Sequence, residues 1–226
     1  MTIQHALDTE TTGLDPESGD RIVEIGVVEM NDGLPTGRSF HAYVDPLRDV
    51  PAAAAAVHGL TRDFLRGKPT FDAIADEFLA FIGDAPLVIH NAEFDAKFLD
   101  AELSAAGKPK LDRTRIIDSI DLARRKFPGQ PASLDALCRR FKISLADRDL
   151  HGAMLDAKLL AEVYLNLTGG RQGSLELLFS GQMAETQETT VVAERPRSAI
   201  AVTPSESELA AHAALVSKLK NPIWSS

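Results

Sequence analysis

Two carboxylates stand at the end of a short apolar segment near the start of the chain, within residues 3–13 (IQHALDTETTG). If this segment begins as a buried strand, the alternation of side chains places Asp8 and Glu10 on the same face. Two carboxylates held that close repel each other unless a cation lies between them. Carboxylate oxygens are the ligands of hard divalent ions, so the pair favours Mg²⁺ or Mn²⁺. The alternative is a polar strand end that enters a turn, where Asp, Thr and Gly are common.

A second acidic cluster, HNAEFD, begins at the end of the apolar run 85–90 (APLVIH). Asn91 and Asp95 are four residues apart and would share one face of a helix, with Phe94 turned toward the core. A helix start directly after a buried strand is where active-site groups gather in open α/β sheets. The alternative makes Asn91 an ordinary N-cap and Asp95 a solvated carboxylate that the helix dipole favours.

The third cluster, in the sequence HGAMLD, contains His151 and Asp156. Five residues turn roughly 140° around a regular helix, so two helical residues at this spacing cannot share one face. We therefore expect Asp156 on a helix and His151 on the loop that enters it. A histidine there suits a general base, because imidazole titrates near neutral pH. The alternative is a helix cap or a surface histidine.

Hydrophobic spacing and turn residues predict the elements that must position these clusters. Runs rich in Val, Ile and aromatic residues predict strands at 21–30 and 38–44 after the first one, and short apolar runs predict two more at 85–90 and 114–117. Helices are expected at 51–60, at 71–82 with Thr70 as its cap, at 91–106 and 119–127, from 134 onward with Ser133 as its cap, and at 151–167. Three strands followed by alternating strand and helix predict an α/β domain with a mixed central β-sheet flanked by helices.

The chain changes character after residue 170, where Gly-Gly closes the last strong helical pattern. Residues 181–205 are rich in Gln, Glu, Thr, Ser and Pro, without apolar periodicity, and predict a flexible linker. A small amphipathic helix is expected within 206–226, before the single Trp224.

Composition narrows the class of protein. The 226 residues are 44% hydrophobic and 25% charged, as in an ordinary globular protein, and no apolar run is long enough to span a membrane. The chain has a single cysteine, Cys138, so it cannot form an intrachain disulfide, which favours a cytoplasmic location. We expect Cys138 to lie in the core. The net charge of −9 argues against a broad basic face for nucleic acid. A site that grips only a strand end through bound metal ions remains compatible with it.

Taken in order, the three clusters read Asp-x-Glu, Asn-x-x-Phe-Asp and His-x4-Asp. They resemble the three motifs of the DEDDh 3′–5′ exonucleases over residues 3 to about 170. The segments DTETTG, VHGL, VIHNAEFD, FPG, SLDALC and LHGAMLDAKLLAEVY are similar to the proofreading (epsilon) subunits of bacterial DNA polymerase III. The resemblance implies a ribonuclease H-like fold for residues 1–170.

The resemblance also implies roles for individual residues. Metal ligands for two divalent ions, Mg²⁺ or Mn²⁺, would be Asp8, Glu10, Asp95 and Asp156, and His151 would be the general base. Substrate-binding residues would be Thr11, His58, Gly59 and Asn91. Asp118 would either contact the metal ligands without binding a metal itself, or simply cap a helix.

The implied reaction removes mispaired nucleotides from primer 3′ ends and releases nucleoside 5′-monophosphates. Residues 171–180 resemble the short peptides that bind sliding clamps, with Gln172, Leu175, Leu177 and Phe179 as anchors; the alternative is that residues 175–179 finish the packing of the domain. Residues 206–226, with Trp224, resemble a segment that docks on the polymerase catalytic (alpha) subunit. Two other functions stay open: a free-standing exonuclease acting on RNA or oligonucleotide ends, and a non-catalytic adaptor that bridges clamp and polymerase.

Overall fold

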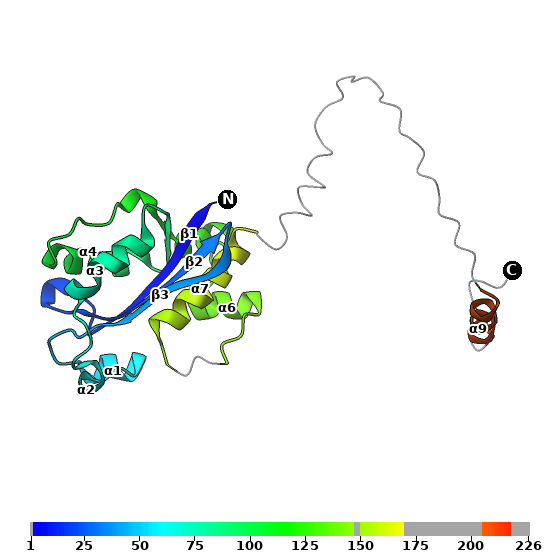
Figure 1. The fold of residues 1–226 in the computed structure, drawn as a ribbon, viewed down its shortest axis with the longest axis horizontal. Coiled ribbons are helices and arrows are strands. Elements are labelled where there is room, and N and C mark those ends of the chain that lie inside the picture. Colours follow the sequence, from blue (N-terminus) through cyan, green and yellow to red (C-terminus); the bar gives the residue numbers. More distant parts are fainter. Residues whose placement is uncertain (1, 147–149, 170–204, 218–226) are drawn as a thin grey trace, which may run out of the picture. The chain divides into compact units, whose positions relative to one another are not determined.

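A computed structural model describes residues 2–146, 150–169 and 205–217. The chain divides into two units, Met1–Met183 and Ala184–Ser226. The first contains the sheet and the helices that pack on it, and the second contributes one helix, α9 (Glu206–Val216) (Figure 1). None of the helices in the described ranges combines the length and the apolar character that a membrane crossing needs.

A mixed sheet of five strands forms the centre of the first unit, in the order β3-β2-β1-β4-β5. β1 pairs antiparallel with β2 and parallel with β4, β2 and β3 form an antiparallel hairpin, and β4 and β5 are parallel. The strands are β1 (Ile3–Thr11), β2 (Ile22–Asn31), β3 (Leu34–Tyr43), β4 (Leu87–Ile89) and β5 (Ile116–Asp118). The predicted α/β fold with a mixed central sheet is therefore confirmed.

Helices follow the strands in the order expected from the sequence. They are α1 (Ala52–His58), α2 (Arg62–Leu65), α3 (Phe71–Ile82), α4 (Ala92–Ala105), α5 (Ser119–Lys126), α6 (Leu134–Phe141) and α7 (Ala153–Leu167). The Ser133 side chain caps α6 as predicted, whereas Thr70 stands at the N-cap of α3 without a side-chain capping bond. The four-residue helix α2 was not predicted, because one turn is too short to show an apolar period.

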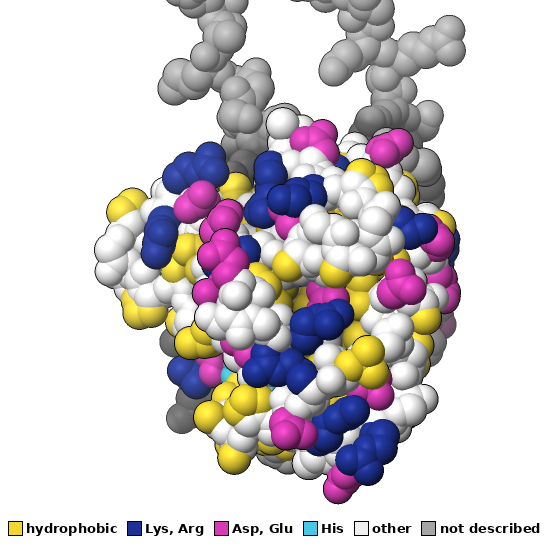
Figure 2. Space-filling model, turned by 90° about the vertical axis from the view of Figure 1, so that its left-hand side faces the viewer, with side chains coloured by type: hydrophobic (Ala, Val, Ile, Leu, Met, Phe, Trp, Pro, Cys, Tyr) yellow, Lys and Arg dark blue, Asp and Glu magenta, His cyan; other side chains and the backbone are white. Residues whose placement is uncertain are grey.

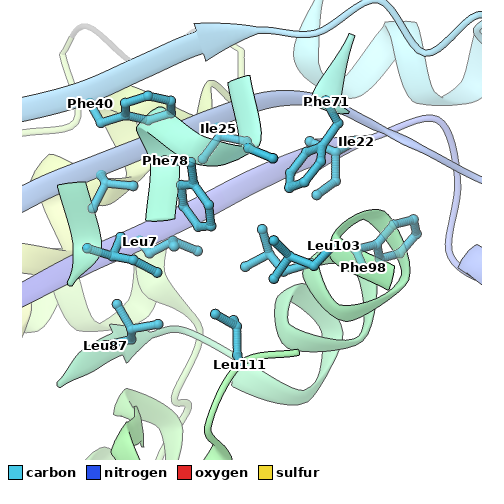
Figure 3. Packing of buried hydrophobic residues seen from close by; sticks show 14 of the residues in the cluster. Leu7, Ile22, Ile25, Phe40, Phe71, Phe78, Leu87, Phe98, Leu103 and Leu111 are labelled. Atoms are coloured by element: carbon cyan, nitrogen blue, oxygen red, sulfur yellow. The ribbon is translucent and has the colours of Figure 1, made fainter. Parts of the chain in front are cut away.

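Two hydrophobic cores lie on opposite faces of the sheet, because successive side chains of a strand alternate. Leu7 and Ile25 belong to the core under α3 and α4, where Phe78 and Phe98 are almost fully buried (Figure 3). Ala6 and Val28 belong to the other core, together with Cys138 on α6 and the apolar residues of α7. The buried position predicted for Cys138 is therefore confirmed.

The hairpin between β2 and β3 differs from the sequence prediction. β3 begins at Leu34 rather than at residue 38, because the turn needs only two residues, Asp32 with φ 50° and Gly33 with φ 81°. Two adjacent positive φ angles are the geometry of a tight hairpin turn, and Asp-Gly is a favoured pair for it. β5 starts two residues later than predicted, because Asp112 caps a 3₁₀ turn at Arg113–Arg115.

Candidate active site

The end of β1 carries the first two carboxylates. Since Ala6 lies in the core on the α7 side of the sheet, alternation directs Asp8 and Glu10 to that side and Thr9 to the α4 side. Asp8 is half-buried and Glu10 is 9% exposed. The carboxylates therefore sit at the rim of the sheet, with buried strand behind them and helix α7 in front.

Helix α7 brings His151 and Asp156 to this rim. Asp156 lies in the first turn of α7 and is 3% exposed, whereas His151 precedes the helix, as predicted, with a side chain that is 49% exposed. His151 Nδ1 lies 3.1 Å from Asp156 Oδ2. Potential ligand atoms of Glu10, His151 and Asp156 all lie within 4.8 Å of one another. This set of two carboxylates and one imidazole suits a divalent metal ion.

A close contact between β2 and α7 makes this approach possible. Gly26 pairs with Asp8 across the β1–β2 ladder. A Cβ atom on Gly26 would lie 2.4 Å from the backbone of Ala153 and Met154, which is too close for any other residue. The missing side chain lets the first turn of α7 rest directly on β2, next to Asp8.

A cavity of about 360 Å³ opens beside these groups. Asp8, His151 and Asp156 line it, together with four residues that were not predicted to belong to the site: His90, Ser133, Leu134 and Asp135. His90 Nδ1 lies 2.8 Å from Ser119 Oγ. The signal for His90 was its place at the end of β4, directly before the second motif.

Asp95 reaches the end of β1 from the other face of the sheet. Its Oδ1 accepts hydrogen bonds from Thr9 N at 3.0 Å and Thr9 Oγ1 at 2.7 Å. The carboxyl group is 3% exposed, and this burial, with a smaller contribution from Asp118, raises the pKa of Asp95 to about 7. Asp95 is thus fixed on the residue between Asp8 and Glu10, although its oxygens are not within the 4.8 Å set of Glu10, His151 and Asp156.

A second, more apolar groove of about 530 Å³ is lined in part by Glu10. Thr11 and His58 line it, as do Leu14, Val57 and Phe94. Leu14 is 83% exposed at its edge. The groove therefore offers apolar contact surface directly beside the carboxylates.

His58 is the last residue of α1 and only 5% exposed. Its Nδ1 accepts a hydrogen bond from Leu60 N at 3.1 Å. Burial lowers the pKa of His58, and the nearby His151 adds to this, while the Thr11 backbone and Glu24 oppose it. A neutral His58 is therefore favoured next to the groove.

The remaining residues named from the sequence occupy different positions. Gly59 ends α1 with φ 75°, and a Cβ there would lie 2.6 Å from Leu150 Cδ1. Asn91 stands at the N-cap of α4 with φ 66°, is exposed, and makes no side-chain capping bond. Neither is among the residues that line the two cavities described above.

Asp118 caps two helices at once. Its Oδ1 accepts from Ile120 N at 2.8 Å in α5, and its Oδ2 accepts from Ala92 N at 3.0 Å in α4. Asp118 thereby holds the helix that carries Asp95. Five residues named as partner contacts lie outside the described residues: Gln172, Leu175, Leu177, Phe179 and Trp224.

The chain is similar to known proteins both in sequence and in fold. A DNA polymerase III subunit epsilon from Rickettsia felis is 47% identical over 217 residues, which cover 94% of this chain and 95% of the relative. A structure of exonuclease X in complex with 5′ overhanging duplex DNA is 28% identical, with a TM-score of 0.59 over 74% of this chain and 92% of its own.

The nuclease domain of 3′hExo, a DEDDh family member bound to rAMP, shares the fold. Its TM-score is 0.64 over 76% of this chain and 92% of its own, at 18% identity. The family model for exonucleases, RNase_T, matches residues 6–164. The chain belongs to the RNase_T exonuclease family and, within it, to the DNA polymerase III epsilon subunits, so the metal-dependent 3′–5′ exonuclease expected from its motifs is confirmed.

Proposed function

We propose that this exonuclease removes mispaired nucleotides from primer 3′ ends as the proofreading subunit of a replicative DNA polymerase, releasing nucleoside 5′-monophosphates. One observation carries the proposal. Glu10, His151 and Asp156 present ligand atoms within 4.8 Å of one another; His151 and Asp156 line one cavity, and Glu10 lines the apolar groove. That arrangement gives a scissile phosphate and its terminal nucleoside adjacent places to bind.

We assign two divalent ions, Mg²⁺ or Mn²⁺, to Asp8, Glu10, Asp95 and Asp156. Bound divalent ions would neutralise the carboxylates toward a phosphodiester anion and stabilise the attacking and leaving oxygens of an in-line displacement. The carboxylates come from both faces of the sheet. Asp8 and Glu10 lie on the side of α7, which carries Asp156, whereas Asp95 is bonded to Thr9 on the other side. The bond from Thr9 to Asp95, next to Asp8 and Glu10, is the reason to include Asp95 as a fourth ligand.

In this proposal His151 accepts the proton of the attacking water. Its side chain is 49% exposed and lies beside Asp156, so it can reach both solvent and the cavity. Asp156 Oδ2, 3.1 Å from Nδ1, orients the imidazole, and the proton of the water would pass to the other ring nitrogen, Nε2.

The apolar groove is proposed to hold the terminal nucleoside, through contacts with Val57, His58 and Phe94 and with Thr11. A mispaired end enters such a groove more readily than a paired one, because less stacking and pairing is lost when it separates from its template. Gly59 and Asn91 do not line the groove. We propose that they contribute to substrate binding only indirectly, through the turns that they form after α1 and β4.

Release of mononucleotides from a labelled primer tests this function. We expect Mg²⁺- or Mn²⁺-dependent release that is faster from a mispaired 3′ end than from a paired one, and that is lost in His151→Ala. An equal or higher rate on RNA 3′ ends would instead favour the free-standing exonuclease. If no nucleotide were released with either metal, the remaining hypothesis would be the non-catalytic adaptor that bridges clamp and polymerase.

We further propose that residues 206–226 dock on the polymerase alpha subunit and that residues 171–180 contact the sliding clamp in the bacterial cytoplasm. Support for docking comes from α9, where Leu209 is 54% and Leu215 is 60% exposed and Ser205 with Glu208 forms a capping box. Deleting residues 205–226 should abolish co-elution with the alpha subunit while leaving nucleotide release intact. Co-elution of the shortened chain would contradict the docking role.

A further inference from the structure

The strand beside the carboxylates contains a buried charge that the proposed mechanism does not use. Glu24 lies in β2 directly opposite Glu10 and is 4% exposed. Burying a carboxylate in an apolar strand is costly unless it is paired and hydrogen-bonded. The partners of Glu24 therefore indicate what it does.

One oxygen of Glu24 bonds the start of α7. Ala153 N donates to Glu24 Oε2 at 3.1 Å, and Ala153 is the first residue of the helix and fully buried. The amide of the first helical residue has no acceptor within the helix, and the N-cap residue, Gly152, has no side chain to bond any of the first amides. A carboxylate from a different strand thus supplies the cap, at the helix end that favours negative charge.

The other oxygen is held by β3. His41 Nε2 lies 2.7 Å from Glu24 Oε1, and the His41 ring packs edge-on against Tyr43, with centroids 4.8 Å apart. With both oxygens engaged, the carboxylate has one orientation. The position of the first turn of α7 is therefore set by the sheet rather than by the loop before it.

That first turn carries the chemistry. His151 stands two residues before Ala153 and Asp156 three residues after it, and Asp156 N bonds Gly152 O at 2.8 Å. The loop before α7 is held by a different contact, because His151 N donates a hydrogen bond to Val57 O in α1 at 3.1 Å. A shift of the helix start would move Asp156 and His151 together relative to Glu10.

We propose that Glu24 is a positioning residue, which fixes the first turn of α7 so that Asp156 and His151 are aligned with Asp8 and Glu10. This inference rests on the proposed function for its effect on turnover. Its structural part, the cap on Ala153, does not depend on that function.

The test compares three variants of the full chain. Glu24→Ala should lower kcat about 10- to 100-fold, as loss of a group that orients metal ligands does, with KM within about threefold of wild type. Glu24→Gln should recover most of kcat, because the amide oxygen still accepts from Ala153 N. Glu29→Ala is the matched control.

Glu29 lies on the same strand and is 6% exposed, but its partners are Arg38 Nη1 at 2.7 Å and Thr36 Oγ1 at 2.8 Å. We expect Glu29→Ala to change the melting temperature as much as Glu24→Ala while keeping kcat. Equal losses of kcat in both alanine variants, or a Glu24→Gln variant as slow as Glu24→Ala, would overturn the positioning role.

Hydrogen exchange separates this inference from the proposed function. The Ala153 amide should exchange faster in Glu24→Ala than in wild type. In Glu29→Ala its exchange rate should equal that of wild type. A wild-type chain without nuclease activity would refute the proposed function. The exchange result would still show whether Glu24 caps α7 through the Ala153 amide. Unchanged protection of Ala153 in Glu24→Ala would overturn the inference.

Discussion

Gly26 and Ala153 are 127 positions apart in the sequence, and their backbones meet with no side chain between them. A Cβ atom on Gly26 would lie 2.4 Å from the carbonyl carbon and oxygen of Ala153. The contact joins the strand that pairs with Asp8 to the helix that carries Asp156. The absence of a side chain at Gly26 thereby lets the segments that carry Asp8 and Asp156, two proposed metal ligands, approach each other.

Gly26→Ala should push α7 away from β2. We expect a loss of about 1–3 kcal/mol in the free energy of unfolding, as for an overpacked core, and a fall in kcat. Urea denaturation and nucleotide release measure the two effects. Gly152→Ala is the control, because a Cβ there would have its nearest neighbour, Glu24 Oε2, at 3.9 Å. Equal effects of the two substitutions would contradict the steric role of Gly26.

Asp8→Ala and Asp156→Ala should each abolish hydrolysis and leave the fold intact. Both residues line the cavity together with His151, and each substitution removes a carboxylate that we propose as a metal ligand. Release of nucleotides from a primer 3′ end gives the rate, and circular dichroism gives the fold. Full activity in either variant would remove the residue from the proposed metal site.

His151→Ala should lower kcat by about 10²- to 10⁴-fold, the usual contribution of a general base. Mn²⁺ affinity, measured by calorimetry, should change less than in Asp156→Ala, because the carboxylates remain. The control is His212→Ala, which removes an exposed histidine on α9. If His151→Ala abolished Mn²⁺ binding, its imidazole would be a ligand rather than the base.

The sequence predicted those parts of the site that depend on local order. Asp8 lies near the end of β1, Asp95 in the first turn of α4 and His151 just before α7, and residues of the right type at such ends could be identified from the motifs. The loop position of His151 followed from its spacing to Asp156. The closeness of Glu10, His151 and Asp156 was implied only by the resemblance.

Contacts fixed by strand pairing could not be predicted. Glu24 meets Ala153 only because β2 pairs with β1 in one register, with a shift between Glu10 and Thr11. Nothing in the sequence near Glu24 specifies that register. The one local signal was a glutamate between Val23 and Ile25, in the apolar first half of β2, which would have suggested a buried partner.

The last prediction concerns stability and pH. His5 in β1 is 2% exposed, its ring lies 5.3 Å from that of Phe81, and neither ring nitrogen makes a hydrogen bond within the described ranges. Burial lowers the pKa of His5, and the positive charges of Arg38 and Arg115 add to this, although Glu29 opposes it. The folded protein therefore favours a neutral His5.

The unfolded chain binds a proton at His5 near pH 6.5, whereas the folded chain does so only at a lower pH. Stability from this residue is thus complete above pH 6.5 and is lost as the pH falls toward the folded pKa. We expect His5→Leu to reduce the drop in melting temperature between pH 7.5 and pH 5.5. His212→Leu, at an exposed site, should leave that drop unchanged, and an unchanged drop in His5→Leu as well would show that His5 is not the buried group that protonates.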